Sequence, residues 1–312
     1  MTLFLANKKS LAELEKDLAA EPFNREVASF YRYTPIRDPQ SFRDRLYKKW
    51  IDLGVLGRIY VAQEGINAQF SVPEHQWQAF LQSLEDEPEL QNMDLNRSEA
   101  PNNRAFLKLT IKVRSKIVSD GLKEDIFLAS TIGTHLDPMS FHEKLSDPQA
   151  LIVDVRNDYE CDIGHFENAF LPDSRTFDKV LSELNEKLQE HKEKDLLLYC
   201  TGGIRCEKTS AYLKSKGYQS VFQLKGGIIS YLKEMKEKNI APKFKGSMFV
   251  FDGRMAEPSV GEIIGRCIDC GKLHGKHVDC ADKACTGLII QCESCAEKSP
   301  AYCPKGCTVR LA

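Results

Sequence analysis

The chain lacks the features that would place a protein in a membrane or outside the cell. None of its 312 residues belongs to a run approaching the ~20 apolar side chains that span a bilayer. Its start, Met1 to Lys9, has no basic segment followed by an apolar core of signal-peptide length. Internal repeats and low-complexity segments are also missing. We therefore expect a soluble, cytoplasmic protein.

Two further absences narrow the function. The formal net charge is only -2, which argues against a uniformly cationic nucleic-acid binder. The sequence has no Gly-x-Gly-x-x-Gly fingerprint, so it offers no flavin or nicotinamide motif. The length suggests more than one domain. We expect a first domain at 1–120, a connector at 121–140, a second domain at 141–241, and a crossing segment with a cysteine-rich tail at 242–312.

Cysteine, by contrast, is plentiful, with 11 in the chain. In a cytosolic protein this number favours metal binding or catalysis over disulfides. The apolar run 196–199 predicts a short buried strand, and 207–216 predicts a helix with Gly217 as its C-terminal cap. Cys200 would then lie at the carboxyl end of a strand and at the start of a helix. Open α/β sheets bind their ligands at such positions.

The residues after Cys200 predict an activated thiol. A free thiol has a pKa of about 8.5, and a helix N-terminus or a nearby cation lowers it. Arg205 supplies a cation that does not deprotonate. Glycines allow successive N–H groups to turn inward and cradle an anion. We therefore expect Cys200 and Arg205 to be catalytic. The active-site loop would be Thr201, Gly202, Gly203 and Ile204.

Two alternatives remain for the cysteines of this segment. A cysteine that ends a strand can be an ordinary core residue, because a free thiol packs as a small hydrophobe. Cys206 is a candidate helper or resolving thiol for Cys200, and a packed helix residue is the favoured alternative.

The first 120 residues alternate in a way typical of a ferredoxin-like fold. The expected order is strand, helix, strand, strand, helix, strand. The strands are expected at 26–33, 58–62, 66–72 and 105–118, and the helices at 38–53 and 73–84, after a short helix at 10–20.

The expected strand 105–118 has an apolar and a basic face. Residues 107, 109, 111 and 113 are apolar and would pack, since side chains alternate across a strand. The basic stripe on the other face consists of Lys108, Lys112, Arg114 and Lys116. Such a stripe suits RNA phosphates, which supply much of nucleic-acid affinity. An ordinary solvated face is the alternative.

The expected strands and helices of the second domain alternate, and this pattern predicts a parallel α/β sheet. The strands are expected at 196–199 and 218–224, and the helices at 141–145, 178–192, 207–216 and 230–238. The segment 246–254 is expected to cross the domain with strand character.

Eight cysteines in the tail form four closely spaced pairs. Pairs of this kind present two thiolates to one metal, and four thiolates close a tetrahedral zinc site. Two zinc ions would stabilise a tail too small to build its own core. The spacing leaves open which pairs combine, and packed reduced thiols or oxidation-dependent disulfides are alternatives. The pairs are Cys267 and Cys270, Cys280 and Cys285, Cys292 and Cys295, and Cys303 and Cys307.

The second domain resembles a rhodanese. Phosphatases of the Cys-loop-Arg type have five residues between Cys and Arg, whereas Cys200 and Arg205 are separated by the four residues that a rhodanese has. Further rhodanese-like segments lie in the right order over about 135–241. They are Ala150 to Arg156, Glu160, Gly164 to Ala169, and Leu224 to Tyr231.

Beyond this domain, the whole chain resembles the bacterial tRNA uridine hydroxylases of the rhodanese superfamily. The matching segments are Tyr60 to Ala68, Cys200 to Lys208, Val250 to Ala256 and the cysteine-rich tail. The resemblance implies oxygen-dependent formation of 5-hydroxyuridine at position 34 of certain tRNAs, with Cys200 as the active-site cysteine, the tRNA anticodon loop as the partner and molecular oxygen as co-substrate. The alternatives are a sulfurtransferase that forms a Cys200 persulfide and a non-enzymatic RNA-binding protein.

Overall fold

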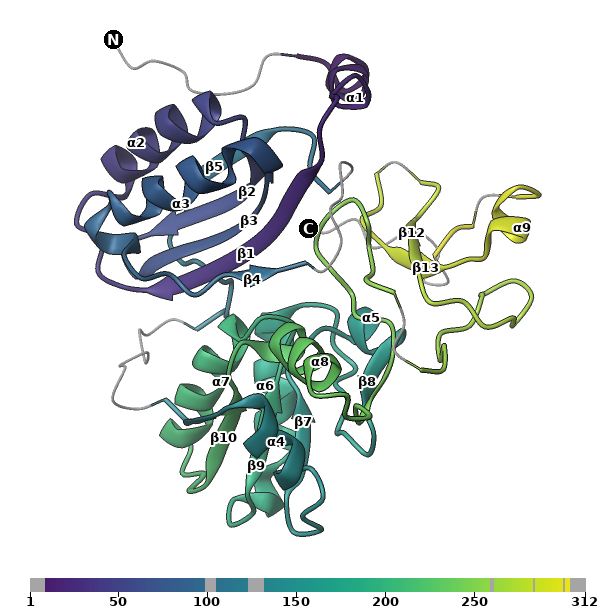
Figure 1. Ribbon diagram of the computed structural model, residues 1–312. Coiled ribbons are helices and arrows are strands. Elements are labelled where there is room, and N and C mark those ends of the chain that lie inside the picture. Colours follow the sequence, from purple (N-terminus) through teal and green to yellow (C-terminus); the bar gives the residue numbers. More distant parts are fainter. Residues whose placement is uncertain are drawn as a thin grey trace. The chain divides into compact units, whose positions relative to one another are not determined.

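The computed structural model describes residues 9–98, 105–122, 132–258, 261–282, 284–299 and 301–303 (Figure 1). The chain divides into two compact units. The first comprises residues 1–119 and 251–254, and the second comprises residues 120–250 and 255–312. Within the described ranges, no helix has the length and apolar character needed to cross a membrane.

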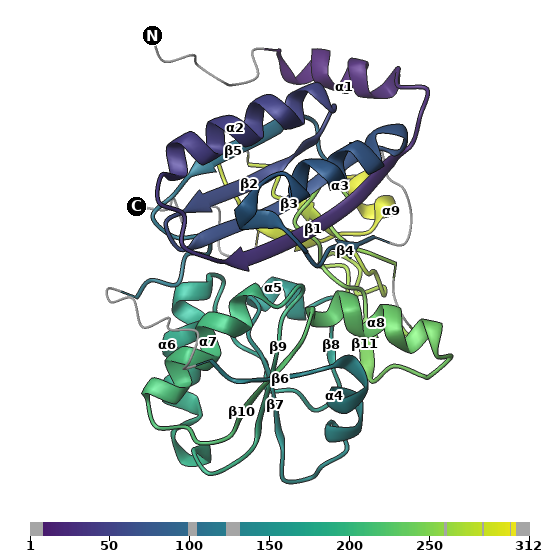
Figure 2. The ribbon, with the colours of Figure 1, turned by 60° about the vertical axis from the view of Figure 1, so that its left-hand side comes forward.

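The first unit is a five-stranded sheet with helices on one face (Figures 1 and 2). Its elements are α1 (Leu11–Ala19), β1 (Arg25–Tyr33), α2 (Pro39–Asp52), β2 (Leu56–Ala62), β3 (Gly65–Pro73), η1 (Glu74–Gln76), α3 (Trp77–Glu85), η2 (Pro88–Leu90), β4 (Asn96–Arg97) and β5 (Leu109–Val113). Asp38 caps α2 by accepting hydrogen bonds from the N–H groups of Gln40 and Ser41. The core under α2 and α3 contains Trp50, Phe70 and Phe80.

The ferredoxin-like order is confirmed, but its fourth strand is not the predicted one. The sheet order is β4-β1-β3-β2-β5, and β3 runs antiparallel to both β1 and β2. The fourth strand of the fold is therefore the two-residue β4, which pairs with β1. The predicted strand 105–118 contributes only β5, an additional edge strand parallel to β2.

The prediction for 105–118 was also too long. β2 ends at Ala62, so the chain has no strand to pair with beyond Val113. After Arg114 the backbone turns away, and the N–H of Ile117 donates to the Glu64 carboxylate at 2.8 Å. Val113, which was expected to pack, is 39% exposed.

The second unit contains a four-stranded parallel sheet of order β6-β10-β9-β7. Its elements are β6 (Thr134–Leu136), α4 (Pro138–Lys144), β7 (Leu151–Asp154), α5 (Asp158–Cys161), β8 (Gly164–Phe166), α6 (Phe177–Lys187), η4 (Gln189–His191), β9 (Leu196–Tyr199), α7 (Ile204–Ser215), β10 (Val221–Leu224), α8 (Gly227–Glu237) and β11 (Phe244–Gly246). In Figure 2, α6 and α7 lie on one side of the strands and α4 and α8 on the other.

This sheet explains the apolar run that was predicted as a strand. All four residues of β9 are buried, because β9 lies between β10 and β7 and is covered on both faces. The predicted parallel α/β architecture is confirmed. Residues 121–140, expected to be a connector, contain β6, which pairs with β10 and forms an edge of the sheet.

The rest of the second unit is built from short antiparallel pairs. β8 pairs with β11, and in the tail β12 (His277–Asp279) pairs with β13 (Leu288–Ile290), followed by α9 (Glu293–Ala296). Arg175 donates from Nη2 to the carbonyl oxygen of Leu288 at 3.3 Å and so holds the tail to the sheet domain. Within the expected crossing segment 246–254, residues 251–254 belong to the first unit.

Candidate active site

Cys200 lies at the carboxyl end of β9, immediately before a tight turn. Gly203 has φ of 105°, a left-handed conformation that a residue with a Cβ rarely adopts, and α7 begins at the next residue. The turn brings the N–H of Gly203 to the Cys200 sulfur at 3.1 Å. Cys200 is fully buried. The predicted arrangement of strand, loop and helix N-terminus is therefore present.

Several groups around Cys200 favour its thiolate. Burial raises the pKa of the Cys200 thiol, but a hydrogen bond from the Cys206 thiol, the charge of Arg205 and the backbone N–H groups of Arg205 and Gly203 together lower this pKa to about 6. Burial raises the pKa of Cys206 well above its usual value, and the neighbouring Cys200 raises it further. At neutral pH the site therefore holds a thiolate beside a protonated thiol.

Arg205 does more than supply charge, because its guanidinium forms a bidentate ion pair with Glu160. Nη1 donates to Oε1 at 2.5 Å, and Nη2 donates to Oε2 at 2.8 Å. Thr201 also donates from Oγ1 to the Glu160 carboxylate at 3.2 Å. Both members of the ion pair are buried. The pair ties the loop after Cys200 to α5.

Glu160 belongs to the site, although its local sequence did not predict it as a site residue. It was identified only as part of a rhodanese-like segment, whereas the structure makes it the partner of Arg205. A signal was present in the sequence. Asn157 and Glu160 have the spacing of a capping box, and the N–H of Asn157 donates to Glu160 Oε1 at 3.1 Å.

Gly227, the first residue of α8, packs against the backbone of Cys200 and Thr201. Gly227 has φ of 66°, and a Cβ there would lie 2.4 Å from the carbonyl oxygen of Thr201 and 2.6 Å from that of Cys200. The close approach allows the N–H of Ile228 to donate to the Cys200 oxygen at 3.0 Å and the N–H of Ile229 to the Thr201 oxygen at 3.2 Å. Glycine is therefore required here for space as well as for conformation.

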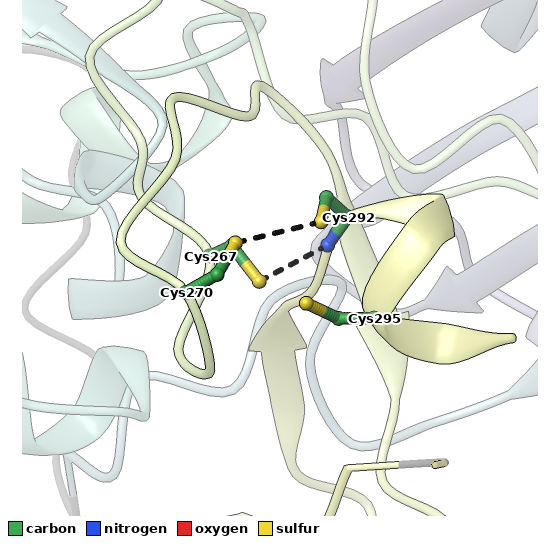
Figure 3. A group of neighbouring side chains, drawn as sticks. All are labelled: Cys267, Cys270, Cys292 and Cys295. Atoms are coloured by element: carbon green, nitrogen blue, oxygen red, sulfur yellow. Dashed lines mark hydrogen bonds between the residues drawn. The ribbon is translucent and has the colours of Figure 1, made fainter. Parts of the chain in front are cut away.

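The tail brings four cysteines together in a first cluster. The sulfur atoms of Cys267, Cys270, Cys292 and Cys295 all lie within 4.8 Å of one another (Figure 3). Cys270 and Cys292 have their sulfurs 3.8 Å apart. Four sulfurs at about 2.3 Å from a zinc ion lie about 3.8 Å from each other in a tetrahedron. The cluster therefore has the ligand number and spacing of a structural zinc site.

A second cluster contains Cys280, Cys285 and Cys303, whose sulfurs also lie within 4.8 Å of one another. The sulfurs of Cys285 and Cys303 are 3.7 Å apart. Cys307, the remaining predicted ligand, lies outside the described residues. Among the described cysteines, the first pair therefore lies beside the third pair, and the second pair lies beside Cys303. Both clusters can hold a metal.

The predicted basic stripe belongs to the first unit and is less regular than expected. Lys108, Lys112 and Arg114 are exposed, and Lys116 is half-buried. Only Lys112 lies within β5, where it is in register with Tyr60 of β2. The Arg114 guanidinium lies over the Tyr60 ring at 5.8 Å.

The neighbouring strand extends this surface. Arg58, in register with Thr110, is exposed beside the stripe. The surface therefore combines cations with an aromatic ring.

Three family models match the chain in succession. They are a UPF0176 acylphosphatase like domain at residues 25–117, a rhodanese-like domain at 137–234 and a rhodanase C-terminal domain at 245–308. A rhodanese-like domain protein from Staphylococcus aureus of known structure is 25% identical, with a TM-score of 0.27, over 31% of this chain and 90% of that one. The parallel sheet, the Cys200 loop and the family models define a protein of the rhodanese superfamily.

Curated relatives identify the family more closely. A protein from Leptospira interrogans is 47% identical over 94% of this chain and 80% of its own length. Relatives from Hamiltonella defensa and Escherichia fergusonii are each 42% identical, over 98% and 99% of this chain and over 87% and 88% of their own lengths. All three are named tRNA uridine(34) hydroxylase. The chain belongs to this family, which confirms the resemblance found in the sequence.

Proposed function

We propose that the protein is an oxidoreductase that hydroxylates uridine 34 of the tRNA anticodon to 5-hydroxyuridine, with dioxygen as co-substrate. The observation that carries this proposal is the identity of 42–47% with the tRNA uridine(34) hydroxylases over nearly the whole chain. A cytoplasmic location follows from a tRNA substrate.

Cys200 is the nucleophile in this proposal. A thiolate that adds to C6 of a uracil ring makes C5 electron-rich, and C5 is the carbon that receives oxygen. The lowered pKa of Cys200 supports this role, because it keeps the sulfur ionised at neutral pH. Arg205 holds the loop through Glu160 and adds to the field that favours the thiolate. Thr201 to Ile204 shape the turn that directs N–H groups toward the sulfur.

The basic stripe is proposed to hold the tRNA. Lys108, Lys112, Arg114 and Lys116 would contact phosphates, which position a nucleic acid without reading its sequence. Bases of an anticodon loop are unstacked and can stack on aromatic or guanidinium surfaces. Arg114 over Tyr60 offers such a surface beside the exposed Lys112.

The tail is proposed to hold two zinc ions, through Cys267, Cys270, Cys292 and Cys295 and through Cys280, Cys285, Cys303 and Cys307. Thiolates are soft ligands that suit zinc. Zinc here would fix the fold of the tail, since four thiolates leave no open coordination position for catalysis. The division into residues 1–120, 121–140, 141–241 and 242–312 also stands as a proposal.

A rhodanese-type sulfurtransferase is the second candidate function, because an ionised Cys200 in this loop is equally suited to carry a persulfide. Nucleoside mass spectrometry distinguishes the two. Unmodified tRNA is incubated with the reduced protein in air, in nitrogen, and with a sulfur donor such as thiosulfate. We expect 5-hydroxyuridine to form in air without a sulfur donor, and not in nitrogen. The Cys200→Ser variant should form none under any of these conditions. A thiolated uridine that needs the sulfur donor would replace the proposal with sulfur transfer.

A further inference from the structure

The proposed hydroxylation needs two electrons that neither substrate provides. Dioxygen takes up four electrons when one of its atoms becomes a hydroxyl group and the other becomes water. Conversion of a C–H bond of uracil into C–OH supplies two of them. The other two must come from a reductant, and the sequence has no fingerprint for a flavin or nicotinamide.

Two sulfur atoms lie together where such a reductant is needed. Gly203 is hydrogen-bonded to both cysteines: its N–H donates to the Cys200 sulfur at 3.1 Å, and its carbonyl oxygen accepts from the N–H of Cys206, in the first turn of α7, at 3.0 Å. The Cys206 thiol donates a hydrogen bond to the Cys200 sulfur, and both residues are buried. Cys161, the other cysteine of the sheet domain, instead lies 3.4 Å from the carbonyl oxygen of Asn157.

We propose that Cys200 and Cys206 form a dithiol that supplies the two missing electrons, so that each hydroxylation leaves a disulfide between them. This inference rests on the proposed function and identifies its internal electron source. An external thiol or dithiol then reduces the disulfide for the next turnover.

The steps balance in atoms and electrons. The Cys200 thiolate adds to C6, which forms a C–S bond, and C5 takes up dioxygen and a proton to give a hydroperoxide. The Cys206 sulfur attacks the outer oxygen, so the O–O bond breaks and leaves a C5 hydroxyl and a sulfenic acid on Cys206.

Two steps then complete the cycle. Loss of the proton on C5 breaks the C6–S bond and releases 5-hydroxyuridine and the Cys200 thiolate. This thiolate attacks the sulfenic sulfur of Cys206, expels the oxygen as water and forms the disulfide. In sum, uracil, dioxygen and two thiols give 5-hydroxyuracil, water and one disulfide.

The structure makes the two cysteines unequal in the way these steps require. The Cys200 sulfur accepts hydrogen bonds from the N–H of Gly203 and from the Cys206 thiol. Both hydrogen bonds favour the thiolate, which is the form that attacks C6 of the uracil ring. Cys206 keeps its proton, because it is buried beside a thiolate. A disulfide between them has an S–S bond of about 2.05 Å, so the two side chains must turn toward each other when it forms.

A single turnover without added reductant tests the inference on the wild-type protein. The reduced protein is freed of reductant in nitrogen and then mixed with excess unmodified tRNA and air. We expect about one 5-hydroxyuridine per chain, a peptide in which Cys200 and Cys206 are linked, and further product only after dithiothreitol is added. Product formed while both thiols stay titratable would overturn the inference.

Variants test the roles separately. Cys206→Ser should form no product in the reductant-free turnover and should regain activity in proportion to added dithiothreitol, whereas Cys161→Ser should behave as wild type. A full yield from Cys206→Ser without reductant would refute the role of Cys206. If the wild type makes no 5-hydroxyuridine even with dithiothreitol and air, the proposed function fails and the inference fails with it.

Discussion

At the scale of single residues, the reactivity of Cys200 reflects a balance between burial and directed polar groups. Removing a thiolate from water raises its pKa, so a fully buried cysteine is ordinarily protonated and inert. Here the hydrogen bonds to the sulfur and the charge of Arg205 outweigh burial. The ionised form is thus a property of the loop, not of the cysteine alone.

This balance predicts a pH profile. Because the pKa of Cys200 is lowered to about 6, the thiolate predominates above that pH and the thiol below it. The rate of Cys200 alkylation by iodoacetamide should therefore rise through pH 6 and level off above pH 7. Arg205→Ala should shift the midpoint to higher pH. An unshifted midpoint in a folded Arg205→Ala protein would show that the guanidinium has no part in ionising Cys200.

Replacing Glu160 by Gln should destabilise the fold but favour the ionised form of Cys200. Glu160→Gln leaves the buried guanidinium of Arg205 without its counterion, and breaking a buried ion pair costs about 3–5 kcal/mol. The same change removes a negative charge from the surroundings of Cys200, so its pKa should fall.

Urea unfolding and the alkylation profile measure these two effects. Glu167→Gln is the matched control, because Glu167 pairs with Lys245 at 2.8 Å on the exposed surface. It should change neither quantity. A Glu160→Gln protein as stable as the wild type would mean that the ion pair with Arg205 contributes nothing to the fold.

The sequence was sufficient to predict the position of Cys200 at the end of a strand, but not its neighbour Glu160. Cys200 follows an apolar run and precedes two glycines, so its local sequence defines its position. The Arg205–Glu160 pair joins α7 to α5 across 45 positions of the sequence. Local patterns carry no information on which acidic residue of a distant segment meets a given arginine.

At the scale of secondary structure, two helices start earlier than their side-chain pattern predicts. The helices expected from 207 and 230 begin at Ile204 and Gly227, each after a glycine with positive φ. Apolar periodicity does not reveal such starts, because the first helical turn is defined by backbone conformation. The predicted strand at 105–118 failed for a related reason, since its length depends on where the neighbouring β2 ends.

Replacing Gly227 by Ala tests whether the backbone conformation at the start of α8 is needed for the fold and for the Cys200 loop. Gly227 and Gly217 both have positive φ, but a Cβ at Gly217 would meet nothing within 4 Å. Gly217→Ala should cost only the conformational strain of about 1–2 kcal/mol. Gly227→Ala should cost a further 1–3 kcal/mol or so, because the methyl group overpacks against the Cys200 loop.

Urea unfolding compares the two variants, and the alkylation profile reports on the loop. Gly227→Ala alone should raise the Cys200 midpoint, because the displaced loop no longer directs its N–H groups at the sulfur. Equal effects of the two substitutions would mean that the carbonyl oxygens of Cys200 and Thr201 move aside freely.

At the scale of the whole molecule, the tail should depend on metal. We expect one or two zinc ions per chain in protein purified under reducing conditions, measured by atomic emission. Cys267→Ser and Cys292→Ser should each lose the same ion, since both sulfurs belong to one cluster. Cys285→Ser should lose the other, and Cys161→Ser neither. Metal-free protein with all tail thiols titratable would reject the zinc sites.

The basic stripe predicts how tRNA affinity depends on salt. Replacing Lys108, Lys112 and Arg114 by Ala should weaken binding and reduce the slope of log K against log salt by about 2, because each phosphate contact contributes about 0.7–0.9. Turnover at saturating tRNA should be unchanged.

Lys48 of α2 provides a matched single-residue control for Lys112. Both side chains are exposed, but only Lys112 lies on β5. Filter binding across a salt titration should show a smaller slope for Lys112→Ala and an unaltered one for Lys48→Ala. The same slope in both variants would place the tRNA on another surface.

The interleaved cysteine pairs also impose an order on how the protein is made. A ribosome releases the chain from its N-terminus at about 5–20 residues per second. Cys267 and Cys270 have no partner sulfurs until Cys292 and Cys295 have been made. Cys280 and Cys285 likewise wait for Cys303. During synthesis the thiols of these two pairs are therefore exposed before their clusters are complete. The first cluster is completed when Cys292 and Cys295 have been made, and the second acquires Cys303 afterwards.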